Sequence, residues 1–234
     1  MRPVAGVTLP FSDRAQAGRL LAQQVAALGL RPPLVVLALP RGGVPVAAEV
    51  ARALQAPLDL LLVRKIGAPW NPELAVAAVV DGEPPQTVID EETLAASGAG
   101  HDHVQRELPA ALREIARRRH LYMHDRAPRS LQGVTAVVVD DGIATGTTAR
   151  AALRGVRLHG ASHVVLAVPV APAGTLAELA AEVDDVVCLA QPSPFGAVGR
   201  FYRDFHAVED DEVLAAMAAA RDGGAPASDG ANDA

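Results

Sequence analysis

Two adjacent carboxylates followed by a glycine- and threonine-rich turn form the part of this chain with the clearest chemistry. Asp140 and Asp141 end the apolar run Val137-Val138-Val139, and residues 142–148 (GIATGTT) lead into a helical pattern. Such a turn gathers backbone N–H donors, hydroxyl groups and the positive end of a helix around one small volume, which suits a phosphate. Carboxylates directly before it can accept hydrogen bonds from sugar hydroxyls or bind a hard cation such as Mg²⁺. The pattern therefore indicates a binding site for a phosphorylated sugar.

A simpler interpretation of the same residues is an ordinary strand-to-helix turn, in which Asp or Thr only caps the helix. The two acids, the run Thr145-Gly146-Thr147-Thr148 and the flanking strand and helix patterns together favour the phosphate site, because a motif counts for more when its expected context is present. The segment has neither the Gly-Lys-Ser/Thr ending of a Walker loop nor the Gly-x-Gly-x-x-Gly of a dinucleotide site.

Residues 140–148 (DDGIATGTT) resemble the phosphoribosyl pyrophosphate (PRPP) motif of the type I phosphoribosyltransferases. From about Phe11 to Val213 the chain is similar to a less characterised bacterial branch of that family. The resemblance implies that Asp140 and Asp141 bind the ribose 2′- and 3′-hydroxyls and that the loop after them binds the 5′-phosphate. The PRPP-binding residues it implies here are Asp140, Asp141, Gly142, Ala144, Thr145, Gly146, Thr147 and Thr148.

A second loop, Pro40-Arg41-Gly42-Gly43, follows the apolar run Leu34–Leu39 and leads directly into another helical pattern. Two glycines let the backbone approach an anion closely, and Arg41 offers a planar charged group suited to phosphate oxygens. The segment resembles the pyrophosphate loop of the same family, which often contains a cis peptide; here it would fall between Pro40 and Arg41. Taken alone, the four residues also fit a plain turn. The resemblance adds Arg41, Gly42 and Gly43 to the PRPP-binding residues.

Two cations, Arg64 and Lys65, end the apolar run Leu58–Val63 and precede a stretch rich in glycine and proline. We expect a mobile loop that closes over the pyrophosphate and excludes water. The alternative is a surface turn with solvated charges.

Four of the seven aromatic residues lie late in the chain: Phe195, Phe201, Tyr202 and Phe205. They suggest either a small hood that stacks on a flat base or one hydrophobic cap. The segment loosely resembles the hood of the hypoxanthine-guanine transferases, which would make Phe195, Phe201, Tyr202 and Arg203 base-binding residues. Packing alone explains each ring equally well.

Short apolar runs alternate with helical patterns along the whole chain. This alternation predicts an α/β protein: a mostly parallel sheet of about five core strands with helices on both faces. The expected strands are Leu34–Leu39, Leu58–Val63, Ala75–Val80, Val134–Val139, Val164–Val170 and Asp185–Leu189. The expected helices are Asp13–Leu28 behind a Ser12 cap, Val44–Leu54, Thr147–Leu158 and Gly174–Val183. Ligands bind such sheets beyond the carboxyl ends of the strands, where both loops fall.

The expected boundaries place one domain at residues 1–220, with a helical insertion at about 91–124 and a hood at about 190–212. Pro109 should start or kink a helix within the insertion. Residues 221–234 are rich in glycine, alanine and aspartate, which predicts a disordered tail.

Composition excludes several classes of protein. Half of the 234 residues are hydrophobic, which argues against a disordered chain. A net charge of −6 argues against a general nucleic-acid or anionic-membrane binder. No apolar run reaches the roughly 18 residues that a membrane span requires. The single cysteine, Cys188, lies in an apolar run, and with no recognisable signal peptide it leads us to expect a cytoplasmic protein.

Together these features predict a PRPP-dependent transferase that moves ribose 5-phosphate to a nitrogenous acceptor, such as a nucleobase, with release of pyrophosphate. Mg²⁺ is the expected cofactor, held by Asp140 and Asp141 partly through the substrate. The expected catalytic residues are Arg41, Arg64, Lys65, Asp140 and Asp141. Oxopurine-salvage relatives place an acid where this chain has Ala144, and a lysine near the strand end 167–170, so the acceptor stays open. A homo-oligomer also stays open.

Two other functions are compatible with parts of this pattern. A non-catalytic regulator that senses PRPP or a nucleotide would keep the 5′-phosphate loop, while its other basic loops could decay. Those loops are intact here, which favours the enzyme. A phosphatase or sugar-phosphate isomerase on a similar sheet would need a nucleophile or base that these loops lack.

Overall fold

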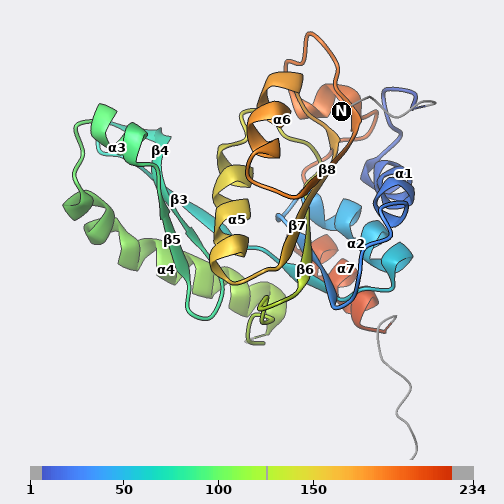
Figure 1. The fold of residues 1–234 in the computed structure, drawn as a ribbon, viewed down its shortest axis with the longest axis horizontal. Helices are drawn as coiled ribbons and strands as arrows, with labels where there is room; N and C mark the ends of the chain where they lie inside the picture. Colours follow the sequence, from blue (N-terminus) through green and yellow to red (C-terminus); the bar gives the residue numbers. More distant parts are fainter. Residues whose placement is uncertain (1–6, 125, 223–234) are drawn as a thin grey trace, which may run out of the picture.

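A five-stranded parallel sheet forms the centre of the protein, with strand order β2-β1-β6-β7-β8 (Figure 1). The computed structural model describes residues 7–124 and 126–222. The strands of this sheet are β1 (Leu34–Ala38), β2 (Leu58–Leu60), β6 (Thr135–Val139), β7 (His163–Val170) and β8 (Asp185–Ala190). All four neighbouring pairs are parallel. The predicted fold class is therefore confirmed.

Helices cover both faces of this sheet because its strands are apolar on both sides. Alternate residues of β6 belong to different cores: Val137 and Val139 pack with α1, α2 and α7, whereas Ala136 and Val138 pack with α5 and α6. Figure 1 shows these two groups of helices on opposite sides of the sheet. The helices are α1 (Arg14–Ala26), α2 (Gly43–Leu54), α5 (Thr147–Leu158), α6 (Ala173–Ala180) and α7 (Asp210–Asp222).

A second, antiparallel sheet projects to one side of the first, at the left of Figure 1. It consists of β3 (Val63–Ala68), β4 (Asn71–Val80) and β5 (Gln86–Ile89), and it is followed by helices α3 (Glu91–Ala96) and α4 (His101–Met123). Two predictions were wrong here. Leu58–Val63 was expected to be one strand, but β2 ends at Leu60 and β3 begins at Val63. Ala75–Val80 was expected in the parallel sheet, but it pairs antiparallel in the small one.

Helix boundaries differ from the sequence expectations at three places. The cap of α1 is Asp13 rather than Ser12, because the Asp13 carboxylate accepts the Gln16 N–H at 2.6 Å. Helix α4 runs through Pro109 instead of starting there. Helix α7 was not predicted; its acidic first turn, residues 210–212, was a usable signal because carboxylates stabilise helix amino ends.

The hood at the carboxyl end of β8 contains a short 3₁₀ helix, η1 (Val198–Phe201), and is tied to the amino-terminal segment. Phe11 and Tyr202 form a parallel bridge, with the Phe11 N–H donating to the Phe201 carbonyl at 2.8 Å. Cys188 is buried in the core, and this burial raises the pKa of its thiol to about 11. Within the described ranges no helix is long and apolar enough to cross a membrane. The predicted tail, apart from the last two residues of α7, lies outside the described residues.

Candidate functional site

The two predicted loops lie side by side at one edge of the parallel sheet. Strands β1 and β6 are neighbours, with Ala38 paired to Val139. The Leu39 N–H donates to the Val139 carbonyl at 2.9 Å, directly before both loops begin. Parallel neighbours end at the same edge of a sheet, so the loop after Leu39 and the loop after Val139 are brought together by the sheet itself.

The glycines of the first loop touch the carboxylates of the second. A Cβ atom added at Gly42 would lie 2.2 Å from Oδ2 of Asp141, and one added at Gly43 would lie 2.8 Å from the Val139 carbonyl oxygen and 3.0 Å from Cα of Asp140. Only glycine allows this approach at either position. The Pro40–Arg41 peptide is cis, as the family resemblance predicted.

Arg14 forms a buried ion pair with Asp141, and the sequence analysis did not identify Arg14 as a site residue. Nε of Arg14 donates to Oδ2 of Asp141 at 2.8 Å, and both side chains are nearly buried. Arg14 also donates to the His206 carbonyl at 2.8 Å and lies 3.9 Å from the ring centroid of Phe205. A signal for it did exist: Arg14 stands at the start of the buried stripe of α1, where a charge needs a partner.

Asp140 has no such cation. It is half-buried, its Oδ1 accepts the Asp141 N–H at 2.9 Å, and no ion pair of its side chain occurs among the described residues. Burial, followed by the negative charge of Asp141, raises the pKa of the Asp140 carboxyl well above its usual value. Asp140 is thus suited to accept hydroxyl donors or a divalent cation from a ligand.

This raised pKa predicts that Asp140→Asn stabilises the unliganded protein. Above the folded-state pKa the ionised carboxylate opposes folding, and Asn removes that charge while its Oδ1 can still accept the Asp141 N–H. We expect the free energy of unfolding at pH 8 to rise by about 1–3 kcal/mol. The gain should disappear as the pH falls below about 4, where the unfolded carboxyl is protonated too. Urea unfolding at both pH values measures it; a loss of stability at pH 8 would contradict the assignment.

The loop after the two acids presents unpaired donors to solvent. Its helix α5 begins at Thr147 behind Gly146, which adopts a left-handed φ of 77° and provides no side-chain cap. Thr145, Thr147 and Thr148 are exposed. The first-turn N–H groups of α5 therefore lack intrahelical partners and lie beside three hydroxyl groups, an arrangement that binds phosphate.

Contacts with α6 and β7 fix the shape of this loop. The Thr175 hydroxyl donates to the Ala144 carbonyl at 3.0 Å, and the Ile143 N–H donates to the Val170 carbonyl at 2.9 Å. A Cβ atom added at Gly146 would lie 2.7 Å from Cγ2 of Thr175. These contacts with neighbouring elements preorganise the loop for a ligand.

Comparison with known families agrees with this geometry. The family described as the phosphoribosyl transferase domain matches residues 13–206, which include both loops and Arg14. The chain belongs to this family.

Individual relatives support the assignment. Two proteins of Mycobacterium tuberculosis, from strains CDC 1551 / Oshkosh and H37Rv and each named "Putative phosphoribosyl transferase", are 50% identical to this phosphoribosyl transferase domain over 208 residues. Those matches cover 88% of this chain and 46% of each relative, so the chain spans about half the length of the curated relatives it matches. The crystal structure of TT1426 from Thermus thermophilus is 43% identical, covers 89% of this chain and 98% of that one, and has a TM-score of 0.79.

Arg41 extends from the phosphoribosyl transferase loop toward α7. Its guanidinium group lies 3.5 Å from Asp210 and 3.7 Å from Glu209, at the start of that helix. Asp210 in turn accepts the Tyr122 hydroxyl of α4 at 2.6 Å. The Arg41 side chain is partly exposed, so these ion pairs contribute little stability and leave the guanidinium able to turn.

Arg64 and Lys65 were expected in a mobile loop, and that expectation was wrong: both lie in β3, paired with Val79 and Ala78 of β4. Successive side chains of a strand point to opposite faces, so the two cations extend from opposite faces of the small sheet. The apolar run before them spans the junction of the two sheets, because β2 ends at Leu60 and β3 begins at Val63. A run of apolar residues does not show where one strand ends and the next begins.

The hood residues predicted to bind a base divide into two groups. Tyr202 is buried between Phe11 and Phe205, at ring-centroid distances of 5.5 and 5.1 Å, and its hydroxyl donates to the Asp141 carbonyl at 2.5 Å. This residue therefore supports the site from within. Phe195 and Phe201 are half-buried and form a pair with centroids 5.0 Å apart, and Arg203 is exposed.

Val198 connects the hood to the PRPP motif and was also missed. A Cβ atom added at Gly142 would lie 2.5 Å from Cγ1 of Val198, so the hood packs directly on the loop.

The residues present can hold Mg²⁺ only together with a ligand. No group of three or more His, Cys, Asp or Glu side chains among residues 7–124 and 126–222 could bind a metal by itself. Mg²⁺ takes oxygen ligands and usually keeps several from water or substrate phosphates. Asp140 and Asp141 supply such oxygens, and no cation in the described part of the chain pairs with Asp140, so the two acids fit an ion shared with bound pyrophosphate.

Proposed function

We propose that the protein is a PRPP-dependent phosphoribosyltransferase that transfers ribose 5-phosphate to a nitrogenous acceptor and releases pyrophosphate. The observation that carries the proposal is the direct contact of the two loops, in which Gly42 and Gly43 lie against Asp141 and Asp140. A ligand with an anion at each end and a sugar between them can span these loops, and PRPP has that form.

In the proposed complex each group of PRPP has a defined neighbour. Asp140 and Asp141 accept the ribose 2′- and 3′-hydroxyls, and their negative charge favours the cationic character that develops at C1. The loop from Thr145 to Thr148 binds the 5′-phosphate, and Arg41 with the backbone of Gly42 and Gly43 binds the pyrophosphate. Bound Mg²⁺ would supply charge neutralisation for the leaving group. Most of the acceleration then comes from positioning, so no nucleophilic side chain is required.

The acceptor would bind under the hood. Phe195 and Phe201 are half-buried rings of the hood, which packs on the loop through Val198, and Arg203 of the same segment is exposed. A flat heterocycle stacked on a ring of this kind gains about 1–3 kcal/mol. Tyr202 is buried and cannot contact the acceptor. The two rings and the guanidinium group of the other three residues suit a flat nitrogenous base, but they do not define which base.

One observation favours the alternative, a regulator that senses PRPP or a nucleotide without turnover. Arg41 lies against Glu209 and Asp210 instead of the sheet edge, so transfer requires its guanidinium to turn by rotation about side-chain bonds. A regulator would need only the 5′-phosphate loop and the two acids. Turnover, rather than binding, therefore separates the two functions.

The test is incubation with PRPP, Mg²⁺ and a panel of purine, pyrimidine and other nitrogenous acceptors, with pyrophosphate release as the signal. We expect release that depends on one class of acceptor and on Mg²⁺. Tight PRPP binding with no release for any acceptor would establish the regulator instead. Absence of PRPP binding in calorimetry would overturn both functions.

A further inference from the structure

A small cavity of about 120 Å³ opens beside the phosphate loop, between α5 and the antiparallel sheet. Lys65, Thr145, Thr147 and Arg150 line it together with small apolar residues, a further cation, Arg154, and two acids, Asp90 and Glu178. The cavity thus places a residue of the small sheet next to the hydroxyl-bearing end of the PRPP motif. None of residues 41–43 contributes to it.

Strand pairing places the Lys65 side chain on the α5 side of the small sheet. Lys65 pairs with Ala78, and Ala78 pairs with Val88, so these three residues form one row across the sheet and share a face. Val88 packs against the core that contains α5. Val80, two residues after Ala78 on the same face, touches α5: a Cβ atom added at Gly155 would lie 2.6 Å from Cβ of Val80. The Lys65 row therefore faces α5.

Arg64 belongs to the neighbouring row, which faces the other way. It pairs with Val79, and Val79 packs in the core with Ala111 and Ile115 of α4. On that side a groove is lined by Arg64 and by residues of α4, including Glu114. Lys65 also borders this groove, but the row it shares with Ala78 and Val88 places its side chain on the cavity side of the sheet. The side chains of Arg64 and Lys65 thus lie on opposite faces of the small sheet.

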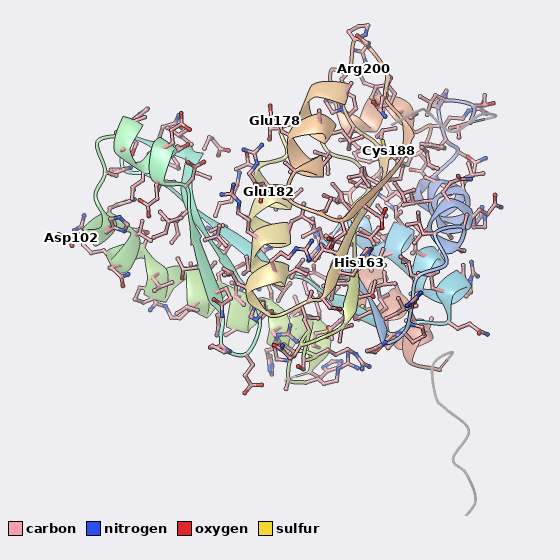
Figure 2. All side chains as sticks on the ribbon, viewed as in Figure 1. Asp102, His163, Glu178, Glu182, Cys188 and Arg200 are labelled. Atoms are coloured by element: carbon pink, nitrogen blue, oxygen red, sulfur yellow. The ribbon has the colours of Figure 1, made fainter. Side chains whose placement is uncertain are left out.

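The donors around the cavity are incompletely paired. Lys65 has no hydrogen bond or ion pair within residues 7–124 and 126–222. Nε of Arg150 is buried and has no acceptor, although the same guanidinium group donates to Glu178 at 2.5 Å. Glu178 lies on α6, where Figure 2 labels it, and it also lines the cavity. Asp90, which follows β5 and lines the cavity, caps α3 by accepting the Thr93 N–H at 2.9 Å. An anion at Thr145 and Thr147 would satisfy donors that the protein leaves open.

We propose that Lys65, assisted by Arg150, binds the 5′-phosphate of the substrate from the α5 side, and does not act on the pyrophosphate. The inference rests on the proposed function and names the ligand group that this cation contacts: a phosphomonoester on the ribose. The small sheet then takes part in substrate binding through the strand that carries Lys65.

Separate ligands test the two ends of the site. Ribose 5-phosphate carries the 5′-phosphate alone, and inorganic pyrophosphate with Mg²⁺ represents the other end. In calorimetry we expect Lys65→Ala to weaken ribose 5-phosphate binding by about 10- to 100-fold, as for loss of a charged hydrogen bond, and to leave pyrophosphate binding unchanged. Arg106→Ala removes an exposed cation of α4 that lines neither the cavity nor the groove, and it should leave ribose 5-phosphate binding unchanged.

A second measurement needs no variant, because Lys65 is the only lysine in the 234 residues. An amine-reactive acylating reagent can modify Lys65 and the chain's amino terminus, which serves as the internal control. Ribose 5-phosphate should slow acylation of Lys65, measured by peptide mass spectrometry, and pyrophosphate should not. Protection by pyrophosphate alone, or equal ribose 5-phosphate affinity in Lys65→Ala, would overturn this inference. A wild-type protein that binds neither ribose 5-phosphate nor PRPP would instead overturn the proposed function.

Discussion

Replacement of Asp140 and Asp141 together by asparagine is expected to abolish PRPP binding. Each carboxylate would lose a charge-assisted hydrogen bond to a ribose hydroxyl, and each such bond contributes about 1.5–3 kcal/mol. Loss of both weakens binding at least about 100-fold, since about 1.4 kcal/mol corresponds to a factor of ten. The amide oxygens of the two asparagines have the size of the oxygens they replace and can still accept the Arg14 Nε–H and the backbone N–H of residue 141. Calorimetry with PRPP and Mg²⁺ measures the change.

The chain contains a matched control for this double variant. Asp184 and Asp185 are another adjacent pair of acids, at the amino end of β8 and thus at the opposite edge of the sheet. Asp184→Asn with Asp185→Asn makes the same change in charge and should leave PRPP affinity within about twofold, because exposed charges a full strand away from a site are screened. Unchanged affinity in the Asp140 and Asp141 variant would remove both residues from the ribose site.

Replacement of Arg14 by methionine should cause the largest loss of stability among the changes considered. The Arg14–Asp141 pair is almost buried, and removal of one member leaves an uncompensated charge inside the protein. Breaking such a pair typically lowers the free energy of unfolding by about 3–5 kcal/mol. Methionine keeps the apolar length of the side chain against Phe205, so the lost charge is the main change. Urea unfolding at pH 7 measures the effect.

The pH dependence of the Arg14 variant has a defined sign. Burial raises the pKa of the Asp141 carboxyl and Arg14 lowers it, so removal of Arg14 leaves that pKa further above its unfolded value. The folded variant therefore takes up a proton more readily than its unfolded chain, and its stability relative to wild type should recover as the pH falls toward about 4. Arg14→Met combined with Asp141→Asn should be more stable than Arg14→Met alone. Equal losses at pH 7 and pH 4 would show that packing, rather than charge, explains the cost.

The two loops could be located from the sequence because each is built from contiguous residues. Asp140 to Thr148 and Arg41 to Gly43 follow runs of strand-forming residues and precede helical patterns, so their place at a sheet edge followed from local periodicity. Their contact required only that β1 and β6 be neighbours. The 3.6- and 2-residue periods of hydrophobic residues identify helices and strands but do not specify which strands pair. The strand order was known only from the structure.

What the sequence could not provide depends on pairing between distant residues. Arg14 and Asp141 are 127 positions apart, and nothing in either local pattern names the other as its partner. The small sheet was missed for a related reason: Ala75–Val80 is as apolar as a core strand, yet it is covered by α5 on one face and α4 on the other. The sequence analysis did not identify Val198 because the residue it contacts, Gly142, has no side chain and lies far from it in the sequence.

The two sheets share no strand pairing within the described residues, so side-chain packing between α5 and β4 contributes to the place of Lys65 relative to the phosphate loop. The Val80 side chain contacts the backbone of Gly155. This contact sets the spacing between α5 and β4, the strand that pairs with β3. One extra methyl group at that point would widen the gap, whereas a smaller residue at Val80 would let the sheet settle closer. The distance that Lys65 can reach therefore depends on the packing of two residues that do not line the cavity.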